Sequence, residues 1–246
     1  MIENAQLISL SRQIALQRQM DVVANNMANI NTSGFKSENI LFEQYVMPVA
    51  RDRDFQRNDQ PLSYVQDWAT IHDLSGGAMV QTGSDLDVGL NGDGFFAVQT
   101  PGGDRYTKSG AFQIAANGNL VDLNGNPVLG EGGPISFGPE ETGIIIAGDG
   151  AVSSSAGAKG KLRLVEFANP QELTREGNNL FAGGTPTAAT NTKAMQGFVE
   201  KSNVSGVSEM AEMIRVTRAY ESAASMTQRQ DDLRRSAIQR LGEANA

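Results

Sequence analysis

The chain has 246 residues, of which 39% are hydrophobic and 20% charged, and its formal net charge is −8. This composition is typical of a globular protein with a real core, and the acidic balance disfavours non-specific binding to nucleic acid, which requires a basic face. The absence of cysteine excludes disulfides, thiolate metal sites and cysteine nucleophiles. Glu3, Arg12 and Arg18 interrupt the N-terminal segment, which therefore predicts neither a secretory signal peptide nor a membrane-spanning helix.

The N-terminal segment has the apolar periodicity of a helix that ends near Ile30, where Asn, Thr, Ser and Gly residues follow. Its apolar residues form two arcs separated by about 120° or more at 100° per residue. The first arc comprises Leu7, Leu10 and Ile14, and the second comprises Leu16, Met20, Val23, Met27 and Ile30. The second arc has the spacing of a coiled-coil seam. Because a helix of this length is marginal alone, the seam needs a second helix from this chain or a neighbouring copy, and two arcs predict two partners.

The rest of the chain separates into three further parts. Residues 36–69 are expected to form an extended linker region, with a polar run, ARDRDFQRNDQP, at 50–61. Residues 70–200 alternate turn signals such as Asn-Gly and Gly-Gly with β-prone runs such as GFFAVQT and KLRLVEF, and this pattern predicts an all-β module of hairpins. A small, polar stretch at 182–194 is expected to be a long loop within that module.

Residues 201–246 regain helical periodicity, with Ser202 or Ser205 as the N-cap. The apolar residues of this helix cover nearly half of its circumference, which is wider than one partner helix requires. The arc includes Val207, Met210, Met213, Ile214, Val216 and Tyr220. The predicted fold class is therefore α+β, with an N-terminal helix over 1–35, the linker over 36–69, the β module over 70–200 and a C-terminal helix over 201–246.

No motif in the sequence predicts a catalytic, metal or cofactor site. The Asp-rich turns that begin at Asp87 and Asp122 lack the ligand spacing of a calcium loop, and the Gly-Lys segment at 157–161 lacks the spacing of a phosphate loop. The single histidine, His72, has no neighbouring motif for a triad or a metal site, and Trp68 is interpreted as a packing anchor. The segments at Asp87, Asp122 and 157–161 are expected to be ordinary turns.

Asn25 and Asn29 remain open to two interpretations. They lie four residues apart, on the side of the first helix away from the second arc, where better helix formers would be expected on a face that only meets water. Either the two side chains are neutral surface, or their amides form hydrogen bonds with another subunit.

Three segments together resemble the axial proteins of the bacterial flagellum, the rod and hook family. They are DVVANNMANINTSGFK at 21–36, GDGFF at 92–96 with YTKSGAF at 106–112, and GFVEKSNV at 197–204 followed by Glu209, Met210 and RAYE at 218–221. In length and in its opening LSRQIALQRQMDVVANN the chain is most similar to the proximal-rod members of this family. A distal-rod or hook-type axial protein is the alternative.

The resemblance implies that the two terminal helices pair as an antiparallel coiled coil in the inner wall of a tube, with the β module outside. It implies assembly with copies of itself and other rod proteins in the periplasmic rod, after export by the flagellar type III apparatus. The implied role is torque transmission by stiffness, with no cofactor, nucleic acid or membrane insertion. A peptidoglycan hydrolase and a secreted adhesin or effector are less favoured, because no convergent acids are found and the sharpest patterns lie at the chain ends.

Overall fold

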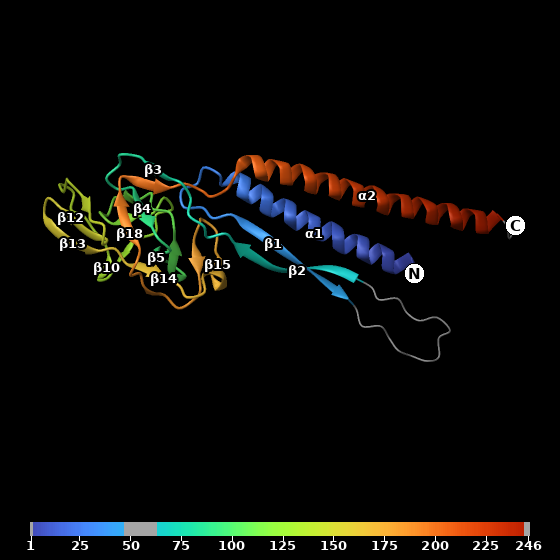
Figure 1. Ribbon diagram of the computed structural model, residues 1–246, viewed down its shortest axis with the longest axis horizontal. Coiled ribbons are helices and arrows are strands. Elements are labelled where there is room, and N and C mark those ends of the chain that lie inside the picture. Colours follow the sequence, from blue (N-terminus) through green and yellow to red (C-terminus); the bar gives the residue numbers. More distant parts are fainter. Residues whose placement is uncertain (1, 47–62, 244–246) are drawn as a thin grey trace. The chain divides into compact units, whose positions relative to one another are not determined.

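The computed structural model describes residues 2–46 and 63–243, and it has the predicted α+β composition (Figure 1). The chain divides into two compact units. The helical unit contains the described residues of Met1–Met27, Glu38–Ile71 and Ser205–Ala246, and the β unit contains Ala28–Ser37 and His72–Val204. The segment that follows the first helix therefore belongs to the β unit.

The helical unit contains helix α1 (Ile2–Ala28) and strands β1 (Glu38–Val46) and β2 (Ser63–His72), followed by helix α2 (Gly206–Glu243); the last residues of α1 and β2, Ala28 and His72, already belong to the β unit. Helix α2 begins directly after Ser205, whose carbonyl accepts the Glu209 N–H at 3.0 Å. β1 and β2 form a two-stranded sheet within the region expected to be an extended linker. The polar run at 50–61 lies outside the described residues.

The β unit is built from short strands joined by tight turns. Its strands and its one short 3₁₀ helix are β3 (Met79–Gln81), β4 (Val88–Asn91), β5 (Phe95–Thr100), β6 (Gly103–Thr107), β7 (Gln113–Ile114), β8 (Leu120–Val121), β9 (Leu129–Gly130), β10 (Gly133–Pro134), β11 (Ile145–Ile146), β12 (Ala151–Ser154), β13 (Gly157–Lys161), β14 (Leu164–Glu166), η1 (Pro170–Glu172), β15 (Thr174–Arg175), β16 (Phe181–Ala182), β17 (Thr187–Ala188), β18 (Lys193–Gln196) and β19 (Phe198–Glu200).

The largest sheet has six strands in the order β15-β16-β6-β5-β14-β17, and a three-stranded sheet has the order β11-β12-β13. The last strands of the unit return to its first strands, because β18 pairs antiparallel with β4 and β19 pairs antiparallel with β3. The first and last strands of the β unit, β3 and β19, are therefore neighbours.

Strand β5 is central to the core because it is buried on both faces. Alternate residues of a strand point to opposite faces of the sheet, so Phe96 and Val98 join one hydrophobic cluster while Phe95 and Ala97 join another. Its neighbour β6 adds Tyr106 to the second cluster. The all-apolar run FFAV is therefore the signature of a strand covered on both sides.

The stretch at 182–194, expected to be a long loop, contains strand β17 and the start of β18. Thr187 and Ala188 pair with Glu166 and Val165 at the edge of the six-stranded sheet. The Thr187 hydroxyl also donates to the Glu166 carbonyl at 3.0 Å. A two-residue edge strand of this kind is too short to produce a periodic signal in the sequence.

Candidate assembly site

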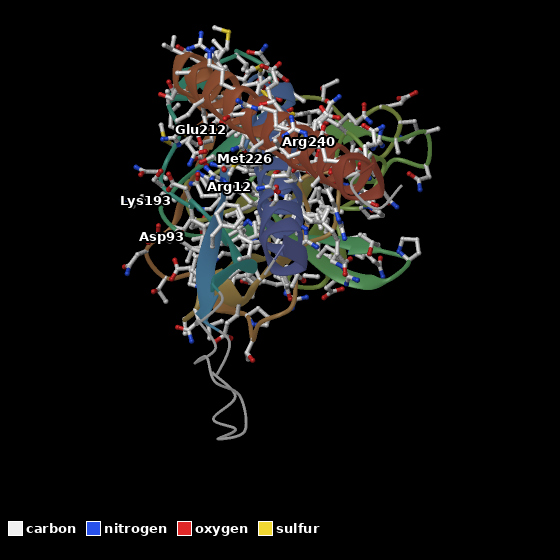
Figure 2. All side chains as sticks on the ribbon, turned by 90° about the vertical axis from the view of Figure 1, so that its right-hand side faces the viewer. Arg12, Asp93, Lys193, Glu212, Met226 and Arg240 are labelled. Atoms are coloured by element: carbon white, nitrogen blue, oxygen red, sulfur yellow. The ribbon has the colours of Figure 1, made fainter. Side chains whose placement is uncertain are left out.

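Helices α1 and α2 lie side by side and run in opposite directions (Figure 1). The Ser9 and Thr227 hydroxyl oxygens are 2.7 Å apart, and Gln19 donates to Glu212 at 2.7 Å. Because residue numbers increase along one helix as they decrease along the other, these contacts fix an antiparallel pair. Figure 2 shows the side chains of both helices, with Arg12, Glu212, Met226 and Arg240 labelled.

Only part of the predicted seam is covered within one chain. The second arc is largely covered: Val23 is buried, and Leu16, Met20 and Met27 of α1 are half-buried, as is Ile30 just beyond the end of α1. On α2, Val216 is buried, and Met213 and Tyr220 are half-buried. The small side chains of Ala15 and Ala223 are also buried; Ala223 continues the stripe of Met213, Val216 and Tyr220, whereas Ala15 lies outside both predicted arcs of α1.

The remaining seam residues of α1 and α2 face solvent. Leu10 and Ile14 of α1 are 52% and 48% exposed. On α2, Val207, Met210 and Ile214 are 79%, 54% and 54% exposed, and their spacing of three and four places them on one helical face. The side chain of Leu7 lies outside the described part of the structure. Within the described part of the chain, each helix thus carries an apolar face that remains exposed.

Asn26, which the sequence did not single out, is a buried polar residue of α1. Its side-chain oxygen accepts the Glu38 N–H at 3.0 Å, and its amide donates to the Glu38 carbonyl at 2.9 Å. The same amide reaches Glu209 of α2 at 3.4 Å, and burial raises the pKa of the Glu209 carboxyl. One amide therefore fixes the start of β1 against α1 and contacts α2.

The two asparagines selected from the sequence occupy different surroundings. Asn25 is exposed. Asn29 is half-buried and makes local contacts, since its carbonyl accepts the Thr32 N–H at 3.1 Å and its side chain contacts the Thr32 hydroxyl. A contact of either residue with another subunit stays a prediction. The Trp68 side chain lies outside the described part of the structure.

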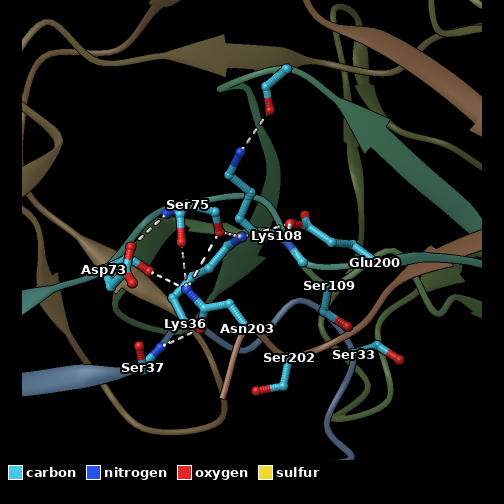
Figure 3. Close-up of polar contacts among 12 residues, drawn as sticks. Ser33, Lys36, Ser37, Asp73, Ser75, Lys108, Ser109, Glu200, Ser202 and Asn203 are labelled. Carbon is cyan, nitrogen blue, oxygen red and sulfur yellow. Dashed lines mark hydrogen bonds and ion pairs between the residues drawn. The ribbon is translucent and has the colours of Figure 1, made fainter. Parts of the chain in front are cut away.

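The β unit contains a polar cluster that the sequence did not indicate, here called the polar anchor: Lys36, Asp73, Ser75, Glu200 and Asn203, of which Lys36 and Glu200 are buried (Figure 3). The Lys36 side chain has no exposed surface, and its ammonium lies 2.6 Å from both a Glu200 carboxylate oxygen and the Ser75 carbonyl. Glu200 also accepts the Gly77 N–H at 2.7 Å. The Ser75 N–H donates to the Asp73 carboxylate, and this bond is the main cause of its lowered pKa.

The segment before Lys36 is fitted closely onto the β unit. Gly34 has φ +67°, and a Cβ there would lie 2.4 Å from the Lys108 backbone, so both conformation and space require glycine. The Arg175 guanidinium lies over the Phe35 ring, 4.1 Å from its centroid, and donates to the Lys36 carbonyl at 3.1 Å. Residues 34–36 are therefore part of the folded β unit, beyond the end of the helix.

A second buried lysine, Lys108, lies near the polar anchor. Its ammonium donates to the Gly92 carbonyl at 2.9 Å and lies 4.9 Å from the Phe95 ring centroid. Burial lowers the pKa of Lys108 to about 8, and the nearby Glu200 carboxylate only partly opposes this effect. The surroundings of Lys108 therefore disfavour its charge.

His72 is buried by packing contacts. Its ring meets Phe181 edge to face with centroids 5.5 Å apart, and its backbone exchanges two hydrogen bonds with the Gln171 side chain. In residues 2–46 and 63–243 no three His, Asp or Glu side chains gather where they could hold a metal ion. None of the described helices is both long and apolar enough to cross a bilayer.

The polar anchor could have been suspected from one feature of the sequence. Lys36 ends the N-terminal motif that carried the family resemblance, and Glu200 lies in the C-terminal motif, so each motif contributes a charge of opposite sign. Nothing local indicates that either charge is buried, because most lysines and glutamates are exposed. Asn26 and its contact Glu209 also lie in the N-terminal and C-terminal motifs, but nothing local distinguishes Asn26 from Asn25 or Asn29.

Both ends and the β unit match family models of one class of proteins, the rod and hook proteins of the bacterial flagellum. Residues 7–36 match the model described as flagella basal body rod protein, and residues 89–154 match the D1 domain of flagellar hook protein FlgE/F/G. Residues 195–240 match the C-terminal model of flagellar basal body rod FlgEFG proteins. The polar anchor joins residues of the two terminal matches, Lys36 and Glu200.

Known relatives align over nearly the whole chain. The flagellar basal-body rod protein FlgF of Caulobacter vibrioides is 39% identical over 99% of this chain and 100% of the relative. FlgF of Mesorhizobium japonicum is 32% identical over 98% and 99%. FlgG of Buchnera aphidicola subsp. Schizaphis graminum is 35% identical over 84% and 88%. The chain belongs to the flagellar basal-body rod protein family, as the sequence motifs predicted, and its place is the basal-body rod.

Proposed function

We propose that this chain is a structural subunit of the proximal part of the rod, that it has no enzymatic activity, and that α1 and α2 form an antiparallel coiled coil in the wall of a helical tube. The partners are copies of the chain and other rod proteins, reached after export by the flagellar type III apparatus. The tube would conduct exported subunits and transmit torque. The near full-length likeness to two FlgF proteins supports the proximal position.

One observation carries this proposal: the paired helices keep an apolar face exposed on each side. Val207, Met210 and Ile214 share a face of α2, and Leu10 and Ile14 share a face of α1, while the pair is already closed by Val23 and Val216. Burying each such side chain against a neighbour would contribute about 1.5 to 3 kcal/mol. Contacts of this kind between unlike faces add subunits without closing a ring, and so they build a helical tube.

The substitution Ile214→Asp tests the proposal. In the free chain the aspartate would meet water, so the purified variant should keep the thermal stability of the parent protein. In a rod the same charge would be buried without a partner, and a strain that carries only this variant should lose motility. Motility is scored on soft agar after secretion of the variant has been verified.

Ser222→Asp is the matched control, because it adds the same charge at an exposed polar position of the same helix. This strain should remain motile. A motile Ile214→Asp strain with normal protein levels would contradict the assignment of this face to the rod contact.

A further inference from the structure

The chain passes between the two units at four places, after Met27, Ser37, Ile71 and Val204. On the side of the β unit these passages lie in or beside three segments: 28–37, 72–77 and 200–204. The polar anchor contains residues from all three segments (Figure 3). The anchor thus joins, within the β unit, the three segments through which the chain continues to the helical unit.

Backbone hydrogen bonds join these segments in pairs. The Gly34 N–H donates to the Glu200 carbonyl at 2.7 Å, and the Asp73 N–H donates to the Ser37 carbonyl at 2.9 Å. Asn203 bridges two segments, because its side-chain oxygen accepts the Ser37 N–H at 2.8 Å while its amide donates to the Asp73 carbonyl at 2.8 Å. The three segments thus form one hydrogen-bonded cluster.

The ion pair between Lys36 and Glu200 is the charged centre of this cluster. Both side chains are buried, and each makes a further bond to the loop after β2: Lys36 to the Ser75 carbonyl and Glu200 to the Gly77 N–H. If the segment 28–37 leaves the β unit, the Glu200 carboxylate loses its counter-ion in a buried site. Release of the segment is therefore strongly opposed.

We propose that the polar anchor is a clamp that holds the segment following α1 beside the segment preceding α2, so that folding of the β unit presents the two helices to each other. Helices α1 and α2 are separated by most of the chain, and closing such a long loop costs entropy. A clamp close to the end of α1 and the start of α2 replaces that loop with two short tethers and raises their effective concentration. Lys36 and Glu200 are then positioning residues for the helix pair.

This inference concerns the single chain and does not depend on rod assembly, so it is tested on the purified full-length protein. Ser9→Cys and Thr227→Cys together place two thiols where the hydroxyl oxygens are 2.7 Å apart, in a chain with no other cysteine. The equilibrium of the resulting intrachain disulfide against glutathione gives the effective concentration of the two helices. Mass spectrometry at low protein concentration separates intrachain from interchain disulfides.

Adding Lys36→Met to the cysteine pair should lower the effective concentration at least tenfold. Lys159→Met is the matched control, since it also removes a lysine ion pair of the β unit, with Glu141, but touches none of the three segments. It should change the effective concentration by less than twofold. Resistance of the β unit to limited proteolysis verifies that each variant remains folded.

Should Lys36→Met unfold the β unit, Asn203→Ala serves in its place, because it removes the bridge between two segments without leaving a buried charge. In the folded protein this variant should lower the effective concentration at least threefold. An unchanged effective concentration in a folded Lys36→Met variant, or in folded Asn203→Ala, would overturn the proposal.

Discussion

Two lysines and one glutamate lie buried near each other in the β unit, and the lysines have different partners. Lys36 is neutralised by Glu200 at 2.6 Å, whereas Lys108 relies on the Gly92 carbonyl and the face of Phe95. A buried cation with a carbonyl and an aromatic ring as its direct partners costs more to keep charged than one in an ion pair. The free energy of unfolding therefore depends on pH, and Lys108 makes the main contribution to this dependence at mildly alkaline pH.

We predict that the free energy of unfolding rises between about pH 8 and pH 9.5. The pKa of Lys108 is about 8 in the folded protein and 10.5 in its ordinary state, so in this range the unfolded chain binds more protons. Stability therefore increases as pH rises through the folded pKa. Urea unfolding at pH 7, 8.5 and 9.5 measures the effect, and Lys108→Met should abolish most of it.

Ionisation of Tyr106 changes the stability in the opposite direction and limits the pH range in which the effect of Lys108 can be measured. Burial raises the pKa of its phenol above 10, so the folded state holds this proton longer than the unfolded chain and stability falls at higher pH. Measurements above pH 9.5 would mix the two effects. A parent protein and a Lys108→Met variant with equal slopes below that pH would contradict the role given to Lys108.

Burial of charge is the feature of single residues that the sequence could not supply. Lys36, Lys108 and Glu200 have ordinary neighbours along the chain, and they are buried only because distant segments fold over them. His72, which has no motif of a triad or a metal site around it in the sequence, is buried with its ring against Phe181. Local chemistry is readable from sequence, whereas contacts across long separations are not.

At the scale of elements, Asn26 acts as a substitute for a strand partner. Its amide pairs with both the N–H and the carbonyl of Glu38, as a neighbouring strand would, and so fixes where the chain leaves the segment after α1 and enters β1. The sequence drew attention to Asn25 and Asn29 and not to Asn26. The partner of Asn26, Glu38, lies twelve residues further along the chain, so no local pattern indicates this contact.

Asn26→Ala should destabilise the start of β1 by about 2 to 3 kcal/mol, because two backbone groups of Glu38 lose their partners in a partly buried place. Hydrogen exchange at the Glu38 amide measures this directly, with faster exchange expected in the variant. Asn25→Ala is the adjacent control at an exposed position and should leave the exchange rate nearly unchanged. Equal protection of Glu38 in both variants would rule out the pairing.

The elements themselves were largely predictable. Both helices and the hairpins of the β unit have strong local signals, namely apolar periodicity and Asn-Gly or Gly-Gly turns. The strands β1 and β2 were expected only as an extended linker, and β17 was expected to be loop, because pairing partners far along the chain define them.

At the scale of the molecule, the two arcs of α1 have different surroundings. Val23 of the second arc is buried and its other members are half-buried, whereas Leu10 and Ile14 of the first arc are about half exposed. A helix with one covered and one open apolar face is suited to a second partner. The prediction that this partner is a neighbouring subunit follows from the two arcs in the sequence.

Cysteines introduced as Leu10→Cys and along α2 should therefore crosslink between subunits in assembled rods, and dimers should appear on non-reducing gels. The pair Ser9→Cys and Thr227→Cys is the control and should crosslink within one chain, since these hydroxyls contact each other. If Leu10→Cys crosslinks only within its own chain, the interpretation of α1 as a helix with two partners is wrong.

The three-stranded sheet of the β unit has an edge strand that resists unwanted pairing. β13, with the sequence GAKGK, carries two lysines and two interior glycine or alanine positions, and the register of its partner β12 shifts between Val152 and Ser153. Charged side chains and irregular register on an edge strand discourage a second chain from adding to the sheet. Subunits stacked in a rod stand at very high local concentration, where open strand edges would join β units at random. In the proposed rod such an edge would leave the order of the subunits to the helices, and neighbouring β units would not join through their strands.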